Sequence, residues 1–198
     1  MSEFGFYDGY WEGKFEHTGA REFVCDMFGD VYTAYLKQIF NHYPRHFKRI
    51  IDLGCGTGGL VPVVREFWPE ASYTGYDICG KAIDYCRGEY PEYEWVHMTK
   101  PVLPPASCDL LVCISVFTHI SIEDTEHYLD QIHAALLPGG LGSLSIHTHG
   151  GDHDWHGTIG PGCMYHRPAF FEGLLEKHGF HITGYYDARQ RQYEVVKL

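Results

Sequence analysis

The chain of 198 residues is long enough for one globular domain with a well-filled core and is short for two. Its formal net charge of −11, with the acidic residues spread along the chain, argues against a nucleic-acid backbone or an anionic membrane as the main partner. No stretch is apolar for long enough to cross a bilayer, and the first residues carry no targeting signal. The seven cysteines form no C-x-x-C pair, which favours buried, reduced thiols in a cytoplasmic protein.

The beginning of the chain is aromatic and polar. Residues 1–18 have no clean periodicity, whereas the apolar spacing from Arg21 to His42 predicts a helix that Pro44 closes. We expect residues 1–45 to form an N-terminal cap or lid, and residues 46–198 to form the main part of a single domain.

From Arg49 onward, strands alternate with helices. The predicted strands are Arg49–Leu53, Ser72–Asp77, Tyr93–Val96, Asp109–Ser115, Leu141–Thr148, Phe180–Tyr186 and Gln192–Leu198. The predicted helices follow the glycine turn up to Trp68, then span Lys81–Gly88, Ile122–Leu137 and Arg167–His178. This pattern indicates a doubly wound, mostly parallel α/β sheet. The last two strands are joined by too few residues for a crossover helix, so the last strand is expected to be antiparallel.

A glycine turn follows the first strand. Asp52 ends an apolar run, and Gly54, Gly56 and Gly58 allow the backbone to turn sharply and a ligand to approach the peptide groups. Gly59 makes the segment also fit the dinucleotide pattern G-x-G-x-x-G. However, the Asp52 carboxylate would repel a pyrophosphate, whereas it can hold a cationic amino-acid group.

Several segments, in the right order, resemble the class I S-adenosylmethionine-dependent methyltransferase family over residues 48–198. These are Asp52–Gly58, Tyr76-Asp77, Ser107–Asp109 with Val116–Ile120, and Leu136–Gly140. The resemblance implies a Rossmann-like sheet of seven strands and S-adenosyl-L-methionine as the cofactor. It implies cofactor binding by Asp52, Gly54, Cys55, Gly56, Gly58, Asp77, Ile78, Met98 and Ser115. One departure is that Met98 stands where the family often carries an Asp for the adenine amino group.

Methyl transfer requires a nucleophile near the methyl group and often the removal of one proton. In such sheets the reaction takes place beyond the carboxyl ends of the strands, so His119, His147 and His149 are the candidate catalytic residues. The alternative for His119 is a packing role at the start of a helix.

The loop over residues 147–156 is rich in His, Gly and Asp. It suits a substrate wall or a base better than a plain loop, and a metal site is the least favoured interpretation, so we predict no metal. His153 and Arg167 are candidate substrate-binding residues, although Arg167 also suits an exposed helix cap.

The N-terminal aromatic residues Tyr7, Tyr10 and Trp11 are assigned to substrate binding as part of a lid. Their rings would favour a sulfonium through cation–π contact and exclude water. The alternative is an ordinary helix that covers the core.

Together these features predict a methyltransferase that acts on an oxygen or nitrogen of a small molecule, as a monomer or homodimer, without nucleic acid or membrane as partner. The competing hypotheses are a non-catalytic, cofactor-binding partner subunit and a nicotinamide-dependent oxidoreductase. The identity of the methyl acceptor has no readable code in the sequence.

Overall fold

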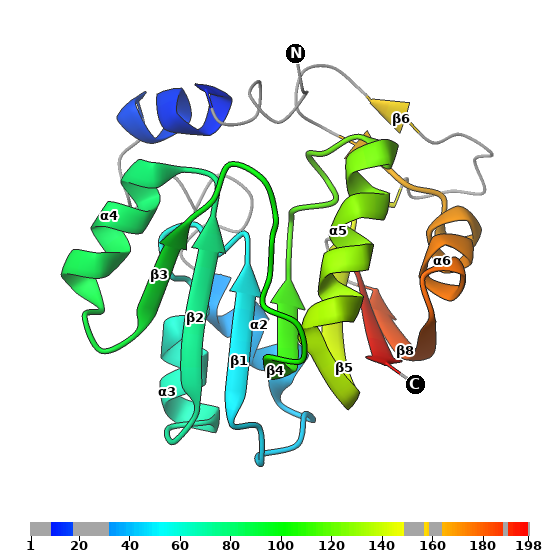
Figure 1. Cartoon of the computed structure of the whole chain (residues 1–198), viewed down its shortest axis with the longest axis horizontal. Helices are drawn as coiled ribbons and strands as arrows, with labels where there is room; N and C mark the ends of the chain where they lie inside the picture. The colour runs from blue at the N-terminus through cyan, green and yellow to red at the C-terminus, as the bar shows by residue number, and fades with distance from the viewer. Residues whose placement is uncertain (1–8, 18–31, 149–156, 159–163, 188–189, 198) are drawn as a thin grey trace. The chain divides into compact units, whose positions relative to one another are not determined.

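The structure, a computed structural model, describes residues 9–17, 32–148, 157–158, 164–187 and 190–197 (Figure 1). The chain divides into two compact units, Met1–Lys100 and Pro101–Leu198. No helix within the described ranges combines the length and apolar character needed to cross a bilayer.

The first unit is built on three parallel strands, with β2 in the middle (Figure 1). The strands are β1 (Arg49–Leu53), β2 (Ser72–Asp77) and β3 (Glu94–His97). The helices are α2 (Tyr32–Phe40), α3 (Val61–Phe67) and α4 (Gly80–Glu89), preceded by an N-terminal helix over residues 9–17. Because the strands are parallel, Leu53, Asp77 and His97 end them at one edge.

Buried side chains explain these elements. Four of the five β1 residues are buried, as expected for a parallel strand. Pro62 stands in the first turn of α3, where its missing N–H costs nothing. The Trp68 ring packs edge-on against Phe40 and Phe47, and its Nε1 donates to the Pro44 carbonyl at 2.7 Å. These contacts join the end of α2 and the segment that follows it to the end of α3.

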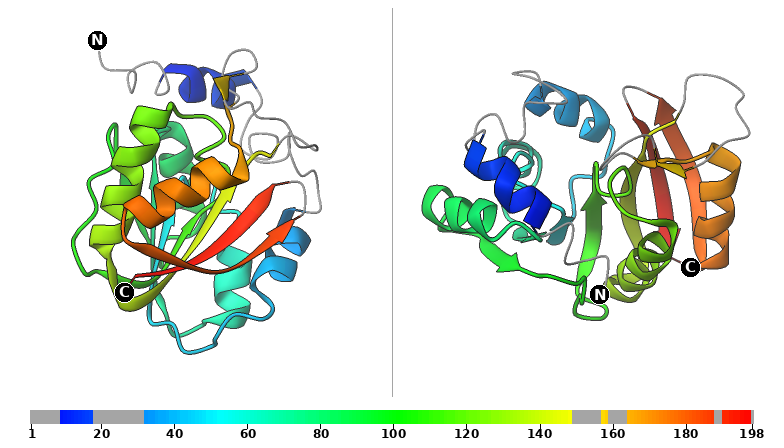
Figure 2. Two further views of the ribbon diagram at one scale, coloured as in Figure 1. Left: turned by 90° about the vertical axis from the view of Figure 1, so that its right-hand side faces the viewer. Right: turned by 90° about the horizontal axis from the view of Figure 1, so that it is seen from above.

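The second unit continues with strands that change direction at the end of the chain. Its elements are β4 (Cys108–Cys113), α5 (Ile122–Ala135), β5 (Leu136–Ile146), β6 (Gly157–Thr158), β7 (Met164–Tyr165), α6 (Pro168–Lys177), β8 (Phe180–Asp187) and β9 (Arg191–Lys197). β4 and β5 are parallel, whereas β9 is antiparallel to both β5 and β8. The orange helix α6 lies against β8 (Figure 2). Its Phe171 ring packs on the ring of Tyr193 in β9.

The predicted fold class is confirmed. The long strands have the order β3-β2-β1 in the first unit and β4-β5-β9-β8 in the second, and the last strand of the chain, β9, is the antiparallel one. Only the residues between Asp187 and Arg191 join β8 to β9, as the short connection predicted.

One local prediction was wrong. The Pro138-Gly139-Gly140 segment was expected to form the turn between the predicted helix Ile122–Leu137 and the predicted strand Leu141–Thr148, but it lies inside β5. It is accommodated by a register shift in the β4–β5 pairing between Cys108 and Leu110, with Gly139 at a φ of +73°. Residues 9–17 form a helix, which the helical alternative for the N-terminal segment allowed, although their sequence has no clean periodicity.

Candidate functional site

The glycine turn between β1 and α3 needs glycine for two reasons. Gly54, Gly56 and Gly58 have φ values of +81°, +53° and +78°, in the left-handed region that side chains disfavour. At Gly58 there is also no room, because a Cβ would lie 2.8 Å from Cε2 of Tyr90. The turn therefore leaves its peptide groups uncovered by side chains of its own.

Backbone hydrogen bonds hold the turn against the end of β2. The N–H groups of Gly54 and Cys55 both donate to the Tyr76 carbonyl, at 2.7 and 3.0 Å. The next N–H group, that of Gly56, donates to Oδ2 of Asp77 at 2.8 Å. The turn is thus fixed in its bent shape before any ligand arrives.

Asp77 links this turn to the one that follows β2. Its Oδ1 accepts from the Cys79 N–H at 2.8 Å, while its Oδ2 is bound by Gly56. Burial raises the pKa of Asp77, and the N–H groups of Cys79 and Gly56 partly offset this rise. Since each carboxylate oxygen has two lone pairs, the group can also accept hydroxyl hydrogens of a nucleoside.

Asp52 is the second buried acid of this unit. It is 5% exposed, and the Tyr73 hydroxyl donates to its Oδ2 at 2.6 Å. Burial raises the pKa of Asp52 to about 7, with a smaller opposing effect from Tyr73 and a further rise from the charge of Asp77. A carboxyl of this kind is balanced between its neutral and ionised forms, and a cationic group beside it would favour the ionised form. Both acids therefore fit the ribose and ammonium groups of the cofactor expected from the sequence.

The half-buried side chains of Ile78 and Met98 follow the ends of β2 and β3. The Met98 N–H donates to the Asp77 carbonyl at 3.0 Å, and His97 Nε2 forms a hydrogen bond with the Ile78 carbonyl at 3.0 Å. The two apolar side chains expected beside the adenine are thus attached to the strand that carries Asp77.

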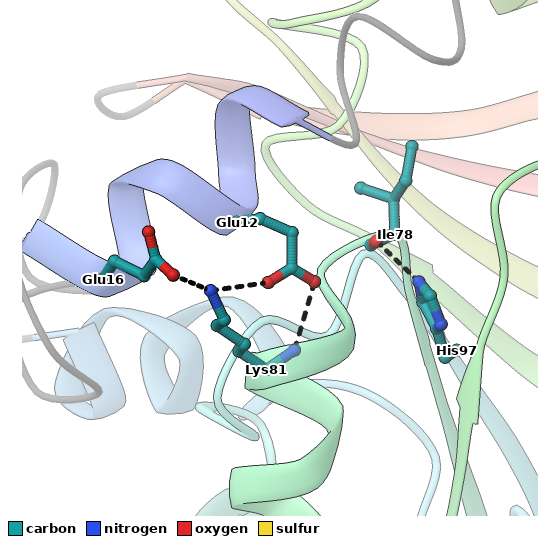
Figure 3. Close-up of polar contacts among 5 residues, drawn as sticks. All are labelled: Glu12, Glu16, Ile78, Lys81 and His97. Carbon is teal, nitrogen blue, oxygen red and sulfur yellow. Dashed lines mark hydrogen bonds and ion pairs between the residues drawn. The ribbon is translucent and has the colours of Figure 1, made fainter.

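The N-terminal helix is fastened to the first turn of α4 (Figure 3). Glu12 Oε1 accepts from the backbone N–H of Lys81 at 3.3 Å, and its Oε2 lies 3.6 Å from the Lys81 ammonium, which also pairs with Glu16. Gly80 makes room for this contact, because a Cβ there would lie 3.1 Å from Glu12 Oε1. The same helix carries Tyr10 and Trp11, whose rings are 5.0 Å apart.

In the second unit, the chain leaves β4 through a constrained serine. Ser115 has a φ of +63°, which is uncommon for a residue with a side chain. Its N–H donates to Ser145 Oγ at 2.8 Å, its Oγ accepts from Gln190 Nε2 at 2.8 Å, and its carbonyl accepts from the Thr118 hydroxyl at 2.8 Å. Half-buried His119 follows in the same turn, before the Ser121 cap of α5, so it is not part of that helix.

His147 follows β5 and forms a bridge with Tyr165, on whose ring it stacks at 5.4 Å. Burial lowers the pKa of His147 below its usual 6.5, so the ring is neutral at pH 7 and able to accept a proton. Arg167 is the residue before α6, and its carbonyl accepts from the N–H groups of Phe170 and Phe171. This position before the helix matches the cap alternative, but the side chain is half-buried rather than exposed, and the role of its guanidinium stays a prediction.

Three predicted site residues, Tyr7, His149 and His153, lie outside the described residues. The same holds for most of the loop over residues 147–156. Among the residues that the structure does describe, no cluster of three or more His, Cys, Asp or Glu side chains is placed to hold a metal ion.

Sequence reasoning missed the residues that support the site. Tyr73 was assigned only to a strand, and Ser145 and Gln190 were given no role. Nothing in a single sequence distinguishes a buried glutamine from one in a polar turn. For Tyr73 a signal existed, since it alternates inward with Gly75 and Asp77 along β2.

Comparison with known proteins gives the family. The sequence profile described as "Methyltransferase domain" matches residues 25–184. Among curated proteins, a trans-aconitate 2-methyltransferase from Azoarcus sp. is 29% identical over 98 residues, which are 49% of this chain and 38% of the relative. The aligned part of this chain thus spans well under half the length of that relative.

Solved structures share the fold at low sequence identity. A SAM-dependent methyltransferase from Leishmania major has a TM-score of 0.78 at 15% identity, covering 98% of this chain and 82% of its own. The 1,6-didemethyltoxoflavin-N1-methyltransferase of Burkholderia thailandensis, solved with its substrate and S-adenosylhomocysteine, has a TM-score of 0.67 at 16% identity, covering 98% and 85%. Because the profile match spans most of its length, the chain belongs to the methyltransferase-domain family.

Proposed function

We propose that this protein binds S-adenosyl-L-methionine and transfers its methyl group to an oxygen or nitrogen of a small molecule. The observation that carries the proposal is the glycine turn tied to Asp77, with the buried Asp52 at the end of the preceding strand. Asp77 would accept the ribose hydroxyls, Asp52 would face the ammonium group, and Gly54, Cys55, Gly56 and Gly58 would line the cofactor. Ile78 and Met98 would flank the adenine, and Ser115 would complete the cofactor-binding set.

The proposed acceptor is a small molecule that carries polar or anionic groups. The trans-aconitate and didemethyltoxoflavin enzymes named above act on small molecules, and trans-aconitate carries carboxylates. Neither relative defines the acceptor of this chain. A net charge of −11 supports the proposal that nucleic acid is not the substrate.

For the proton that leaves an acceptor hydroxyl or amine, we assign His147 as the base. Its lowered pKa keeps the imidazole neutral at physiological pH, and its position after β5 is where the chemistry of this fold takes place. In the transfer, the acceptor heteroatom forms a bond to the methyl carbon, the carbon–sulfur bond breaks, and the acceptor proton moves to the imidazole. His119 and His149 are the other candidate bases.

The N-terminal cap is proposed as a lid, with residues 1–45 covering the domain of residues 46–198. The contact of Glu12 with the first turn of α4 supports this role, since that turn directly follows Asp77 and Ile78. Tyr7, Tyr10, Trp11, His153 and Arg167 are the proposed substrate contacts. A cytoplasmic location and a monomeric or homodimeric state complete the proposal.

Calorimetric titration with S-adenosylhomocysteine and with NAD tests the cofactor. We expect binding of the former alone, and expect Asp77→Asn to weaken it at least about tenfold because charged hydrogen-bond acceptors are worth about 1.5–3 kcal/mol. Asp84→Asn is the matched control, since Asp84 is an exposed acid of α4 that pairs with Arg87. Binding of NAD instead would favour the oxidoreductase hypothesis, and absence of both would overturn the proposal.

A second measurement separates an enzyme from a partner subunit. Release of S-adenosylhomocysteine from S-adenosylmethionine is followed over a panel of carboxylates, phenols and amines that includes trans-aconitate. Turnover of any acceptor supports the enzyme. Cofactor binding without turnover across the panel favours the non-catalytic partner subunit.

A further inference from the structure

Three polar residues form a closed ring of hydrogen bonds beyond the end of β4, through their side chains and the backbone N–H of Ser115. The Ser115 N–H donates to Ser145 Oγ at 2.8 Å, the Ser145 hydroxyl donates to Gln190 Oε1 at 2.5 Å, and Gln190 Nε2 donates to Ser115 Oγ at 2.8 Å. The members come from three separate segments of the second unit. Ser145 and Gln190 are fully buried, whereas Ser115 is half-buried.

The direction of these bonds follows from burial. Ser145 Oγ already accepts the backbone N–H of Ser115, so its own hydrogen needs an acceptor inside the protein. The Gln190 amide oxygen supplies that acceptor, and this orientation turns the amide nitrogen toward Ser115. The opposite orientation would leave the buried Ser145 hydroxyl hydrogen facing the amide hydrogens.

These bond directions leave the hydroxyl hydrogen of Ser115 for a ligand. The Ser115 oxygen accepts from Gln190, and among the contacts of the described residues its hydroxyl hydrogen has no acceptor. A hydroxyl that accepts a hydrogen bond becomes a better donor, because bonds in a chain polarise one another. The ring thus prepares a donor on the one member that a ligand can reach.

The backbone of Ser115 is held in place as firmly as its side chain. A φ of +63° costs a non-glycine residue free energy, and such conformations persist where the surroundings impose them. Here the N–H is bound by Ser145 and the carbonyl by the Thr118 hydroxyl at 2.8 Å. The conformation directs the chain away from β4 and fixes where the hydroxyl lies.

We propose that the Ser115 hydroxyl donates a hydrogen bond to a carboxylate oxygen of a bound small molecule, and that Gln190 and Ser145 are positioning residues for it. This inference rests on the proposed function, because two carboxylates come into question there. One belongs to the amino-acid end of the cofactor, and the other belongs to a carboxylate methyl acceptor. A fixed neutral donor suits either, since an ionised carboxylate only accepts.

The structure offers a matched control. Gln192 Nε2 donates to Ser143 Oγ at 2.8 Å, two residues further along the same strand pair, and both groups are buried. Gln192→Met removes one buried glutamine–serine bond and Gln190→Met removes two, so both should lower the melting temperature. Only Gln190→Met releases Ser115. A third variant, Ser115→Gly, tolerates the positive φ without strain and removes the hydroxymethyl side chain.

The variants are titrated with S-adenosylhomocysteine and with 5′-methylthioadenosine, which lacks the amino-acid end. A further titration adds trans-aconitate to protein saturated with S-adenosylhomocysteine. If the cofactor is the source of the carboxylate, Ser115→Gly and Gln190→Met weaken S-adenosylhomocysteine about tenfold or more and leave 5′-methylthioadenosine unchanged. If the acceptor is the source, only the affinity for trans-aconitate falls. Gln192→Met should bind every ligand as the wild type does.

Wild-type affinities in Ser115→Gly and Gln190→Met for both carboxylate ligands would overturn the inference. Equal weakening of S-adenosylhomocysteine and 5′-methylthioadenosine would also overturn it, because that result indicates a purely structural role. Failure of the wild type to bind S-adenosylhomocysteine would instead remove the proposed function, and this inference with it.

Discussion

Replacing Asp52 by asparagine should make the protein more stable while it weakens cofactor binding. The carboxyl is 5% exposed, and burial raises its pKa from 3.8 to about 7. An acid with a raised pKa in the folded state favours folding least when it is ionised. Stability is therefore lost as the pH rises from about 4 to about 7, and the loss is complete above that range.

The size of the effect follows from the shift. Each pKa unit corresponds to about 1.36 kcal/mol, so the shift of Asp52 costs about 4 kcal/mol at pH 8, where the folded-state carboxyl is ionised. At pH 5 the carboxyl takes up a proton on folding, and the cost is about 2 kcal/mol. The neutral amide of the Asp52→Asn variant would have no such cost. Its oxygen can still accept from the Tyr73 hydroxyl, which in the wild type lies 2.6 Å from Asp52 Oδ2. We expect the substitution to raise the free energy of unfolding by up to these amounts.

Urea unfolding of the wild type and Asp52→Asn at pH 5 and pH 8 measures both numbers. Asp84→Asn serves as the control, because that side chain is 75% exposed. A variant that is no more stable than the wild type at pH 8, or a difference that does not grow with pH, would refute the reasoning. Titration with S-adenosylhomocysteine should show affinity reduced about tenfold to a hundredfold, the worth of a charge-assisted bond.

Three further predictions concern the turn, the cap and the base. Gly58→Ala should destabilise the protein by about 1–3 kcal/mol, because the alanine would have a positive φ and a Cβ 2.8 Å from the Tyr90 ring. Wild-type stability of the variant in chemical unfolding would contradict this prediction. Lys81→Met should speed hydrogen exchange in the N-terminal helix, because it removes the ion pairs that hold this helix to α4. Arg87→Met removes another ion pair of α4 and should leave the exchange rate unchanged. Equal rates in both variants would contradict the proposed attachment of the helix through Lys81. Because burial lowers the pKa of His147, turnover should rise as the pH passes a value below 6.5 and then level off. His147→Gln should abolish this rise, and an unchanged pH profile in that variant would show that another group is the base.

The parts of the fold that were predictable are those whose cause is local. β1 matches its prediction residue for residue, because a buried parallel strand reads as an apolar run and the glycines mark where it ends. The antiparallel β9 followed from the length of one connection. By contrast, the Gly139 segment continues β5 because the neighbouring β4 accommodates a register shift, and no local pattern reports on a neighbour.

In the candidate site, too, the sequence predicted the residues with local signals and missed those that depend on distant contacts. Asp52 was found at the end of an apolar run, and Asp77 was found at the end of the second predicted strand, where the family resemblance places an acid. Both are short-range features of the sequence. Tyr73 and Asp52, which share a hydrogen bond, are 21 positions apart in the sequence. Gln190 is 45 positions from Ser145 and 75 from Ser115, and Glu12 is 69 positions from Lys81. Such pairs depend on how the chain closes on itself, and the single sequence shows only ordinary polar residues at these positions.

The reactivity of two cysteines near the glycine turn can report on local opening of that turn. The Cys86 thiol lies 3.4 Å from the Gly56 carbonyl, Cys55 belongs to the turn itself, and both thiols are buried with raised pKa values, to about 12 for Cys86. Because the thiolate is the reactive form, neither should react with an alkylating reagent while the turn is in place. Their labelling rate would therefore report how often the turn opens locally. A ligand that binds to the turn should slow the labelling even if it contacts neither sulfur.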